Sequence, residues 1–417
     1  MQTLLFSPGA YNLAETTRCI EVAKACRHDF NTLFMSYGGE FEPLITQAGF
    51  ALERLEPQIT SAKADHIYKV DQGKKIGYMF SVDEVEMQVR NELALFERVK
   101  PAAVVTGFNM SNSISCRVAQ VPLVWLTHST WMLHSLLEAR LGTWPDMLDF
   151  PPLNWLPDAA LLWLTKRAFA LTTLILRPYS QVAATYGQAP FTNVEQIWTG
   201  DYNLLAEPAE FCELPLPPSY HYISPLIGRL DLPIPEEILQ LPRDKPLVYF
   251  AMGSSGQPQV IAKIITGLKD RPYRVIAPVA RLLKGLNVPI PDNVLVTDWL
   301  PAHKVNPMAD ISVIHGGIGT VMTACLAGKP VVGISMMFEQ EANIDCLVRQ
   351  GFARRIRKNR LTSEKLSLAI ETLLADGEAQ RKAQAFQKVV QASLDPTSIT
   401  RFFVGAFGNG QPALADR

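Results

Sequence analysis

The sequence lacks the features that mark several large classes of protein. Its 417 residues carry a formal net charge of −1, so no basic footprint for nucleic acid is present. Its six cysteines are scattered, without a CxxC pair or a histidine at metal-ligand spacing. No internal repeat of short period and no low-complexity tract is visible. We therefore expect neither a nucleic-acid partner nor a bound metal ion.

Apolar runs long enough for targeting or for crossing a membrane are also scarce. The opening stretch MQTLLFSPG has neither a charged leader nor an apolar run of signal length, so we expect it to form a first strand. We expect Cys19 and Cys26 to be buried thiols in a reducing compartment, and the protein to be cytoplasmic. The most apolar stretch, Ala159 to Leu176, is interrupted by Lys166 and Arg167. At ~1.5 Å per residue it barely reaches across ~30 Å of hydrocarbon, which argues against a transmembrane helix.

A dinucleotide fingerprint is missing as well, because the first strand leads into SPGAYN and not into GxGxxG. This argues against a nicotinamide-dependent oxidoreductase. What is present is a globular composition, with 48% hydrophobic and 19% charged residues. A chain of 417 residues suggests two domains of roughly 200 residues each. Strand and helix patterns alternate from Thr3 onward, which predicts doubly wound parallel sheets. Near the C-terminus we expect helices from Ala342 to Gln350, from Ser363 to Ala375 and from Gly377 to Ala392.

The most informative stretch runs from Ile311 to Gln340. An apolar strand (Ile311 to Ile314) leads into the glycine turn His315 to Thr320, and a helical segment then ends at Gly328 before a second apolar strand. In such a βαβ unit the glycines allow close approach of a ligand, and the helix N-terminus attracts anions. The pattern favours a diphosphate-binding cradle. The alternative is a glycine turn that only lets helix and strand pack closely, with His315 as a structural histidine.

Three segments together carry a family resemblance. They are Asp298-Trp299-Leu300-Pro301, the glycine turn His315 to Thr320, and Glu339-Gln340 with Asn343. They resemble the nucleotide-sugar signature of the UDP-glycosyltransferase superfamily, most strongly between about Pro246 and Arg357. The resemblance implies the GT-B fold, an α/β architecture of two facing Rossmann-like domains with doubly wound parallel sheets.

The expected domain organisation follows from this resemblance and from proline density, which is high between Leu214 and Asp244. We expect an N-terminal acceptor-binding domain (1–225), a proline-rich linker (226–245) and a C-terminal nucleotide-sugar-binding domain (246–395). A C-terminal helix and tail (396–417) would cross back to the first domain.

The resemblance assigns donor-binding roles by matching positions. Trp299 would stack on the nucleobase, His315 and its turn would hold the phosphates, and Glu339 would accept hydrogen bonds from sugar hydroxyls. The full set is Gly253, Ser254, Trp299, Leu300, Ala302, His315, Gly317, Gly319, Thr320, Glu339 and Gln340. Two positions depart from the family: Ala302 stands where Gln is frequent, and Thr323 stands where Glu usually holds the ribose. The resemblance implies a UDP-sugar as the preferred donor, with no cofactor and no metal, and Thr323 leaves a dTDP-sugar open.

The catalytic dyad common in this family is missing. The expected histidine falls on or near Ala10, and the later strand ends at Gly107 without the usual aspartate. His128, at the end of another strand, is the first candidate for the general base, and Glu15 is the second. Alternatively, the acceptor is already ionised, as a carboxylate or phosphate would be, or the protein only binds or hydrolyses the sugar nucleotide.

Tryptophan and proline gather between Trp131 and Ile175. One interpretation is a set of helices packed over the N-terminal sheet. The other is an apolar acceptor pocket open towards a membrane surface, which makes 131–176 a candidate for peripheral membrane contact. We assign the acceptor pocket to four residues: Tyr11, Asn12, Phe108 and Trp131.

These observations predict an inverting, metal-independent glycosyltransferase of the hexosyltransferase type. It would move a sugar from a nucleoside-diphosphate sugar to an apolar or aromatic small molecule or lipid. The alternatives are a GT-B-fold sugar-nucleotide epimerase or hydrolase, and a non-catalytic nucleotide-sugar-binding protein.

Overall fold

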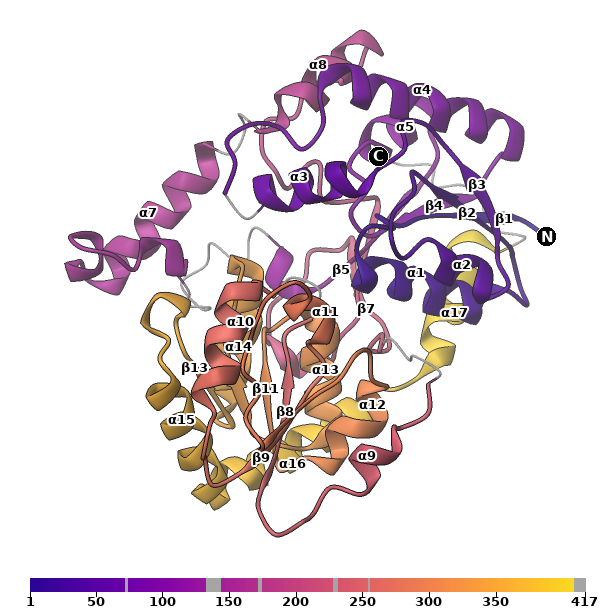
Figure 1. The fold of residues 1–417 in the computed structure, drawn as a ribbon. Coiled ribbons are helices and arrows are strands. Elements are labelled where there is room, and N and C mark those ends of the chain that lie inside the picture. Colours follow the sequence, from indigo (N-terminus) through magenta and orange to yellow (C-terminus); the bar gives the residue numbers. More distant parts are fainter. Residues whose placement is uncertain (72–73, 133–143, 172–174, 228–231, 254–255, 409–417) are drawn as a thin grey trace.

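The computed structural model describes residues 1–417 except 72–73, 133–143, 172–174, 228–231, 254–255 and 409–417. Strands and helices alternate along the chain and form two α/β domains, one above the other in Figure 1. Each domain is built on its own parallel sheet, as the alternation of patterns in the sequence predicts.

The N-terminal sheet has the strand order β3-β2-β1-β4-β5-β6-β7, and all neighbouring pairs are parallel. Its strands are β1 (Thr3–Ser7), β2 (Asn31–Ser36), β3 (Ala51–Arg54), β4 (Ala103–Thr106), β5 (Leu123–Thr127), β6 (Tyr202–Leu205) and β7 (Tyr220–Tyr222). The helices of this half are α1 (Leu13–Cys26), α2 (Pro43–Gln47), α3 (Ser61–Asp71), α4 (Val82–Val99), α5 (Asn112–Ala119), α7 (Asp158–Leu171) and α8 (Arg177–Thr185). The strand order reverses between β1 and β4, so ligands are expected at the carboxyl ends of these two strands.

The C-terminal sheet has the order β10-β9-β8-β11-β12-β13 and is also parallel throughout. Its strands are β8 (Leu247–Ala251), β9 (Arg274–Ala277), β10 (Val294–Val296), β11 (Ile311–Ile314), β12 (Val331–Gly333) and β13 (Ala353–Arg355). The helices are α9 (Glu236–Leu239), α10 (Pro258–Gly267), α11 (Ala280–Leu283), α12 (Ala302–Val305), α13 (Ile318–Ala327), α14 (Phe338–Gln350), α15 (Ser363–Ala375), α16 (Gly377–Ala392) and α17 (Pro396–Phe407). The reversal here lies between β8 and β11.

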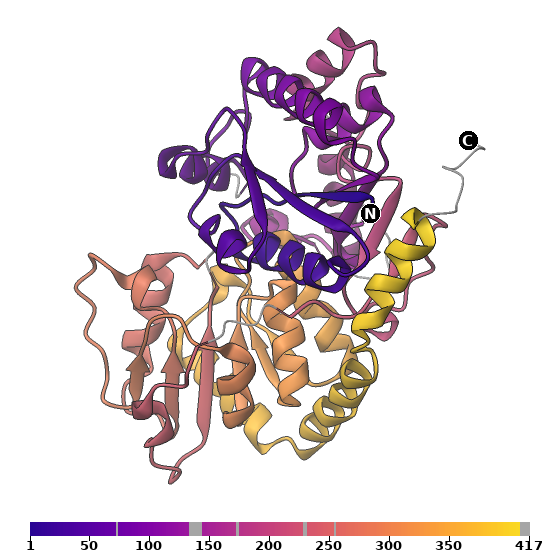
Figure 2. The same ribbon diagram turned by 90° about the vertical axis from the view of Figure 1, so that its right-hand side faces the viewer.

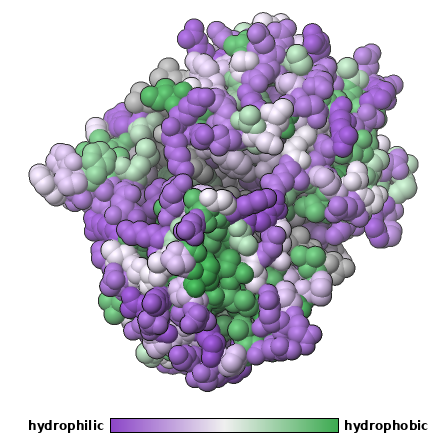
Figure 3. All heavy atoms as spheres, in the orientation of Figure 1, coloured by the Kyte–Doolittle hydropathy of each residue, from purple (hydrophilic) through white to green (hydrophobic). Residues whose placement is uncertain are grey.

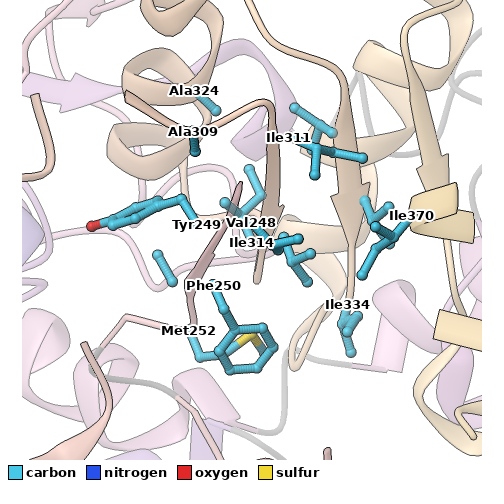
Figure 4. Close-up of a cluster of buried hydrophobic side chains, with 14 of the residues drawn as sticks. Val248, Tyr249, Phe250, Met252, Ala309, Ile311, Ile314, Ala324, Ile334 and Ile370 are labelled. Atoms are coloured by element: carbon cyan, nitrogen blue, oxygen red, sulfur yellow. The ribbon is translucent and has the colours of Figure 1, made fainter. Parts of the chain in front are cut away.

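The core of the C-terminal domain explains why its central strands are continuous apolar runs. Every residue of β8 and β11 is buried, as expected for strands covered by helices on both faces. Val248 of β8 lies opposite Ile311 of β11 in the strand register, and Figure 4 shows both in a buried cluster that also includes Ile370 of α15. The first turns of α15 and α16 are capped by the side chains of Thr362 and Asp376, so both helices start where the sequence predicts.

The last helix, α17, returns to the N-terminal domain. Figure 2 shows it, in yellow, reaching up from the C-terminal domain to the side of the upper domain. Phe403 of α17 is completely buried in the same cluster as Leu4 of β1 and Cys19 of α1. The hydroxyl of Thr400 also donates to the backbone oxygen of Ala25 at 2.8 Å. Helix α17 therefore links the C-terminal domain to the N-terminal domain.

Helix α7 of the tryptophan-rich segment differs from one of the two interpretations of the sequence, in which the helices of this segment pack over the N-terminal sheet. α7 projects from the body of the protein in Figure 1, and Trp163 on it is 55% exposed. The expectation that helices here pack over the N-terminal sheet is therefore wrong for α7, because its aromatic side chain faces outward. Among the residues that the structure describes, no helix is both long and apolar enough to cross a membrane.

Candidate functional site

A cavity of about 500 Å³ lies between the two domains. Loops that follow β1, β4 and β5 form one wall, and loops that follow β8, β10 and β11 form the other, so the reversal points of both sheets face it. The structure brings these predicted residues to the cavity: Tyr11, Asn12, Glu15, Phe108, His128, Trp131, Gly253, Trp299, Leu300, Ala302, His315, Gly317, Gly319, Thr320, Glu339 and Gln340. Ser254 lies outside the described residues.

The glycine turn after β11 houses the imidazole of His315. A β-carbon at Gly253 would come within 2.6 Å of the ring, and one at Gly317 would come within 2.6 Å of Nε2. Glycine is required at both positions because any side chain would collide with the ring. Gly316 has a different role. Its φ is +96°, and a β-carbon there would come within 2.6 Å of the backbone oxygen of Gln340. The glycines of this turn therefore differ in role: Gly317 makes room for the imidazole of His315, and Gly316 allows close packing on α14.

The N-terminus of α13 opens towards the same space. Its N-cap is Gly317, and no side chain in the described part of the chain caps this helix. A β-carbon at Gly319, in the first turn, would meet no atom within 4 Å. The imidazole of His315 lies next to this turn. Burial lowers the pKa of His315 to about 4, so the ring is neutral. The site therefore offers unpaired backbone donors and the partial positive charge of a helix N-terminus.

Trp299 forms a second wall of the cavity together with residues of both domains. It is half-buried, and the guanidinium of Arg281 lies 5.4 Å from the centre of its ring. The ring of Phe41, from the N-terminal domain, meets it edge-on with centroids 6.4 Å apart. Arg281 also forms an ion pair with Glu40, so one cluster links the predicted nucleobase platform to the opposite domain.

The helix that carries Glu339 begins earlier than the apolar pattern predicts. The sequence places its start at Ala342, whereas α14 starts at Phe338. Glu339 and Gln340 therefore lie in the first helical turn, where a carboxylate is favoured by the helix dipole. The Oε1 atom of Gln340 accepts a hydrogen bond from the backbone N–H of Met336 at 2.9 Å, which supports the loop before the helix.

His128 directly follows β5 and points into the cavity from the N-terminal side. Its side chain is 2% exposed, and its Nε2 lies 3.3 Å from Oε1 of Glu339. Burial is the largest cause that lowers the pKa of His128, and the positive charge of Arg18 lowers it further. Burial raises the pKa of Glu339 to about 8. Since burial disfavours charge on both groups, we assign the resting pair as a neutral imidazole beside a carboxylic acid.

Glu15, the second candidate base, is held in an ion pair. It lies in the first turn of α1, where the side chain of Arg18 donates to its Oε1. Its Oε2 occupies the space beside Gly107, where a β-carbon would collide with it. Glycine at the end of β4 thus makes room for a carboxylate from another element. Glu15 is engaged with Arg18, whereas His128 faces Glu339 across the cavity.

An aromatic wall lies next to His128. The rings of Phe108 and Trp131 are 6.2 Å apart, and the ring of Trp131 lies 6.3 Å from the imidazole of His128. Behind it, Trp198 packs edge-on against Trp131 at 4.8 Å. Asn12 also borders the cavity, but its side chain accepts hydrogen bonds from the backbone of α1. The apolar side of the cavity is therefore formed mainly by aromatic rings.

Known proteins match this chain in sequence and in fold. Residues 273–404 match the family model for the C-terminal domain of erythromycin biosynthesis protein CIII-like proteins. The chain is 25% identical over 394 residues to a PGL/p-HBAD biosynthesis glycosyltransferase of Mycobacterium tuberculosis, a match that covers 92% of this chain and 89% of that protein. These matches support the resemblance of the chain to the UDP-glycosyltransferase superfamily.

Two further matches are a sequence relative and a solved structure. A PGL/p-HBAD biosynthesis rhamnosyltransferase of Mycobacterium bovis is 27% identical over 317 residues, which covers 74% of this chain and 69% of that protein. The solved structure of the glycosyltransferase VinC in complex with dTDP superposes with a TM-score of 0.69 at 17% identity, covering 97% of this chain and 98% of that one. The predicted GT-B fold is confirmed, and the protein is a glycosyltransferase.

In this glycosyltransferase, residues 144–149 contact the C-terminal domain. Asp146, only 4% exposed, accepts hydrogen bonds from Arg355 at 2.8 Å and from Arg357 at 2.9 Å. The guanidinium of Arg357 lies 3.4 Å from the ring centre of Trp144. A few residues further on, Asp149 pairs with Arg360. These contacts clamp the segment onto the donor-side domain, so buried Trp144 belongs to a domain interface and not to the acceptor pocket.

Several residues that shape the site of this transferase escape sequence reasoning. Arg18, Arg281 and Thr130 lie outside the three segments that resemble the family signature. Charged or hydroxyl residues in helices and loops are common, so their residue type alone does not mark them as part of a site. The one available signal for Arg18 is its spacing of three from Glu15, which places both on one face of a helix. For Arg281 and Thr130, only the tertiary structure reveals the partner, because each partner lies in the other domain.

Proposed function

We propose that this glycosyltransferase moves a hexose-type sugar from a UDP- or dTDP-linked donor to a hydroxyl group of an apolar or aromatic small molecule or lipid. Transfer would invert the anomeric carbon and need no metal. The observation that carries the proposal is the position of His128. Its imidazole lies between the aromatic wall on one side and Glu339, at the donor cradle, on the other.

The donor would lie along the C-terminal wall of the cavity. The diphosphate fits the N-terminus of α13 beside His315, where Gly319 leaves the approach open. The nucleobase fits against Trp299, and the sugar then lies near Glu339 at the start of α14. Since Oε1 of Glu339 contacts both His128 and Asn343, we assign its other oxygen to a sugar hydroxyl. The VinC structure, which holds dTDP, supports a donor of this class.

The chemical step would be a single displacement. The acceptor oxygen attacks the anomeric carbon on the face opposite the diphosphate, and the bond from that carbon to the diphosphate oxygen breaks. The electron pair leaves with the nucleoside diphosphate, and the acceptor's proton passes to Nε2 of His128. Backbone N–H groups of α13 would stabilise the charge that develops on the leaving group, the role that oriented dipoles play in other active sites. The neutral state of His128 suits a base.

The acceptor would lie against Phe108 and Trp131. Aromatic rings bury apolar surface and orient flat ligands, so this wall favours an apolar or aromatic acceptor over a strongly polar one. The hydroxyl of such an acceptor has to be deprotonated as it attacks, which gives His128 its task. An acceptor that is already ionised would need no such base.

Calorimetric titration with UDP and with dTDP in EDTA tests the donor site. We expect binding of at least one nucleotide to the wild-type protein without divalent metal, and much weaker binding to His315→Ala. The preferred nucleobase then identifies the donor class. Failure of both nucleotides to bind wild type would overturn the assignment of the cradle.

Release of nucleoside diphosphate separates transfer from the alternatives. We expect release from a UDP- or dTDP-hexose to depend on a phenolic acceptor, with a product whose anomeric configuration, read by proton NMR, is inverted. Release at the same rate without acceptor would indicate a hydrolase. Binding with no release under any condition would indicate a non-catalytic nucleotide-sugar-binding protein.

The outward-facing aromatic residues of 131–176 support a further partner, an anionic lipid surface. Trp155 is 77% exposed and Trp163 is 55% exposed, and Figure 3 shows green apolar atoms on the projecting arm where α7 lies. Arg167 lies 5.3 Å from the ring of Trp163. Tryptophan beside basic residues is typical of the membrane–water interface, where the ring is buried and the cation meets lipid phosphate.

Co-sedimentation with vesicles tests this contact. We expect binding to phosphatidylcholine vesicles that contain phosphatidylglycerol, weaker binding to phosphatidylcholine alone, and loss of binding in Trp155→Ser/Trp163→Ser. Binding to neither type of vesicle would remove the membrane from the proposed partners and leave the transfer reaction unaffected.

A further inference from the structure

Four side chains form a closed ring of polar contacts behind the cavity. Nδ1 of His128 lies 2.7 Å from Oγ1 of Thr130, and that oxygen lies 2.5 Å from Oδ1 of Asn343. Nδ2 of Asn343 donates to Oε1 of Glu339 at 2.7 Å, and Oε1 of Glu339 lies 3.3 Å from Nε2 of His128. His128, Thr130 and Asn343 are each at most 2% exposed, so water does not compete for these contacts.

The direction of each hydrogen bond follows from one fixed group. Asn343 also lies 2.9 Å from the backbone oxygen of Gly316, and a carbonyl oxygen can only accept. The atom that faces Gly316 must therefore be the amide nitrogen, which turns the amide oxygen towards Thr130. A hydroxyl group has one hydrogen, and Thr130 has to donate it to that oxygen. Its lone pairs then face His128, so Nδ1 of His128 must carry a hydrogen.

We infer that Thr130 and Asn343 are positioning residues that hold His128 as the Nδ1–H tautomer, so that the lone pair of Nε2 faces Glu339 and the cavity. The inference rests on the proposed role of His128 as the base. In the opposite tautomer, Nδ1 would need the hydrogen of Thr130. The oxygen of Asn343 would then be left without a donor in a buried position, which proteins avoid.

The ring also links the base to the donor cradle. His128 and Thr130 follow β5 of the N-terminal sheet, whereas Asn343 lies on α14 and holds Gly316 in the glycine turn after β11. The base therefore has its working tautomer enforced only when the two domains are closed. In this way the enzyme couples assembly of the base to the arrangement that encloses the donor.

The tautomer can be observed directly, without any acceptor. We would label the histidines of the full-length protein with ¹⁵N, record long-range proton–nitrogen spectra, and assign His128 by comparison with His128→Gln. We expect the Nδ1–H form in wild type, a shift to Nε2–H in Thr130→Val, and recovery of the Nδ1–H form in Thr130→Ser. The Nε2–H form in wild type, or an unchanged tautomer in Thr130→Val, would overturn the inference.

Thr16→Val provides the matched control. Thr16 is a fully buried threonine of α1 whose hydroxyl donates to the backbone oxygen of Asn12 at 2.8 Å, outside the ring. We expect it to leave the tautomer of His128 unchanged. A shift equal to that of Thr130→Val would show that loss of any buried hydroxyl nearby suffices, and the specific role of Thr130 would be rejected.

Kinetics with a UDP- or dTDP-hexose and a phenolic acceptor separate this inference from the proposed function. We expect Thr130→Val to lower kcat at least 10-fold with the KM for donor unchanged, and Thr130→Ser to restore most of it. Full activity in His128→Gln would reject the proposed base itself. An inactive His128→Gln together with a fully active Thr130→Val would reject only the positioning role.

Discussion

Two helix N-termini face each other across the cavity, and they are built in opposite ways. α1 follows β1 and is capped by Asn12, whose side chain accepts hydrogen bonds from the backbone of Ala14 and Glu15. α13 follows β11 and starts after its N-cap Gly317, with no capping side chain in the described part of the chain. The side chain of Asn12 satisfies backbone donors of α1, whereas no described side chain does so at α13. One cap residue thus distinguishes the two strand–helix units, and the uncapped unit suits the anion-binding role that we propose for it.

The charges near the two helix ends follow the same division. The first turn of α1 contains Glu15, which already stabilises the dipole and pairs with Arg18. The first turn of α13 contains no acidic residue. An anionic diphosphate would therefore be repelled at α1 and attracted at α13. The charges therefore support our proposal that the donor lies on the C-terminal side and the acceptor on the N-terminal side.

His128→Ala tests this division of labour with the largest expected effect. We expect transfer to fall about 10²- to 10⁴-fold, because removal of a general base has effects of this size. Nucleotide affinity should stay within about twofold of wild type, a small change on the free-energy scale of binding. Steady-state kinetics and calorimetry measure the two quantities. The matched control is His28→Ala, an exposed histidine. Full activity in His128→Ala would contradict the role of the base.

Trp299→Ala should weaken the donor side alone. We expect nucleotide binding to lose roughly 1–3 kcal/mol, by analogy with stacking of bases on aromatic side chains elsewhere. Calorimetry with UDP or dTDP measures the loss, and Trp163→Ala, on the exposed face of α7, serves as the tryptophan control. Unchanged affinity in Trp299→Ala would remove this residue from the site.

Gly319→Ala separates the fold from the ligand at α13. A methyl group there meets no protein atom, and alanine in a helix is more favourable than glycine by about 1 kcal/mol. We expect thermal stability to be equal or higher, while nucleotide binding falls about 10-fold, or about 1.4 kcal/mol, because the methyl group obstructs the phosphates. Gly405→Ala in α17 has the same open surroundings and should leave binding unchanged. Equal binding in both variants would argue against phosphate contact at Gly319.

Asn12→Ala is the counterpart at α1 and has the smallest expected effect. Loss of the cap should lower the free energy of unfolding by about 1 kcal/mol. Nucleotide affinity should not change, since this helix end is not part of the proposed donor site. Chemical denaturation and calorimetry provide the two measurements. If Asn12→Ala weakened nucleotide binding as much as Gly319→Ala does, the contrast between the two helix ends would be wrong.

The C-terminal domain was the more predictable half, because its signals are local. Gly328 ends α13 in a left-handed conformation, and helices α15 and α16 begin at the residues predicted from the sequence. The start of α14 was misplaced because its first turn, Phe338 to Glu341, is rich in polar residues that carry no helical apolar period. Glycine turns and helix caps act over a few residues, so a reader of the sequence can find them.

The N-terminal side was less predictable, because its contacts are distant along the chain. Trp131 lines the cavity, whereas Trp144 packs on Arg357 and Trp163 faces outward, although all three belong to one aromatic stretch. Cysteines behave similarly: the sulfurs of Cys212 and Cys346 lie 3.0 Å apart, a proximity that their spacing in the sequence does not suggest. Composition identifies such residues as apolar, but not which surface each of them meets.

The sequence by itself determined the two-domain α/β fold and the glycine turn after β11, since these depend on backbone conformation and hydrogen bonds between near neighbours. Only the tertiary structure decided that His128 meets Glu339 and that Thr130 and Asn343 complete a ring across the domains. The physical reason is that His128 and Thr130 lie in one domain, whereas Glu339 and Asn343 lie in the other. Packing of the two sheets, and not any local pattern, brings them within hydrogen-bonding distance.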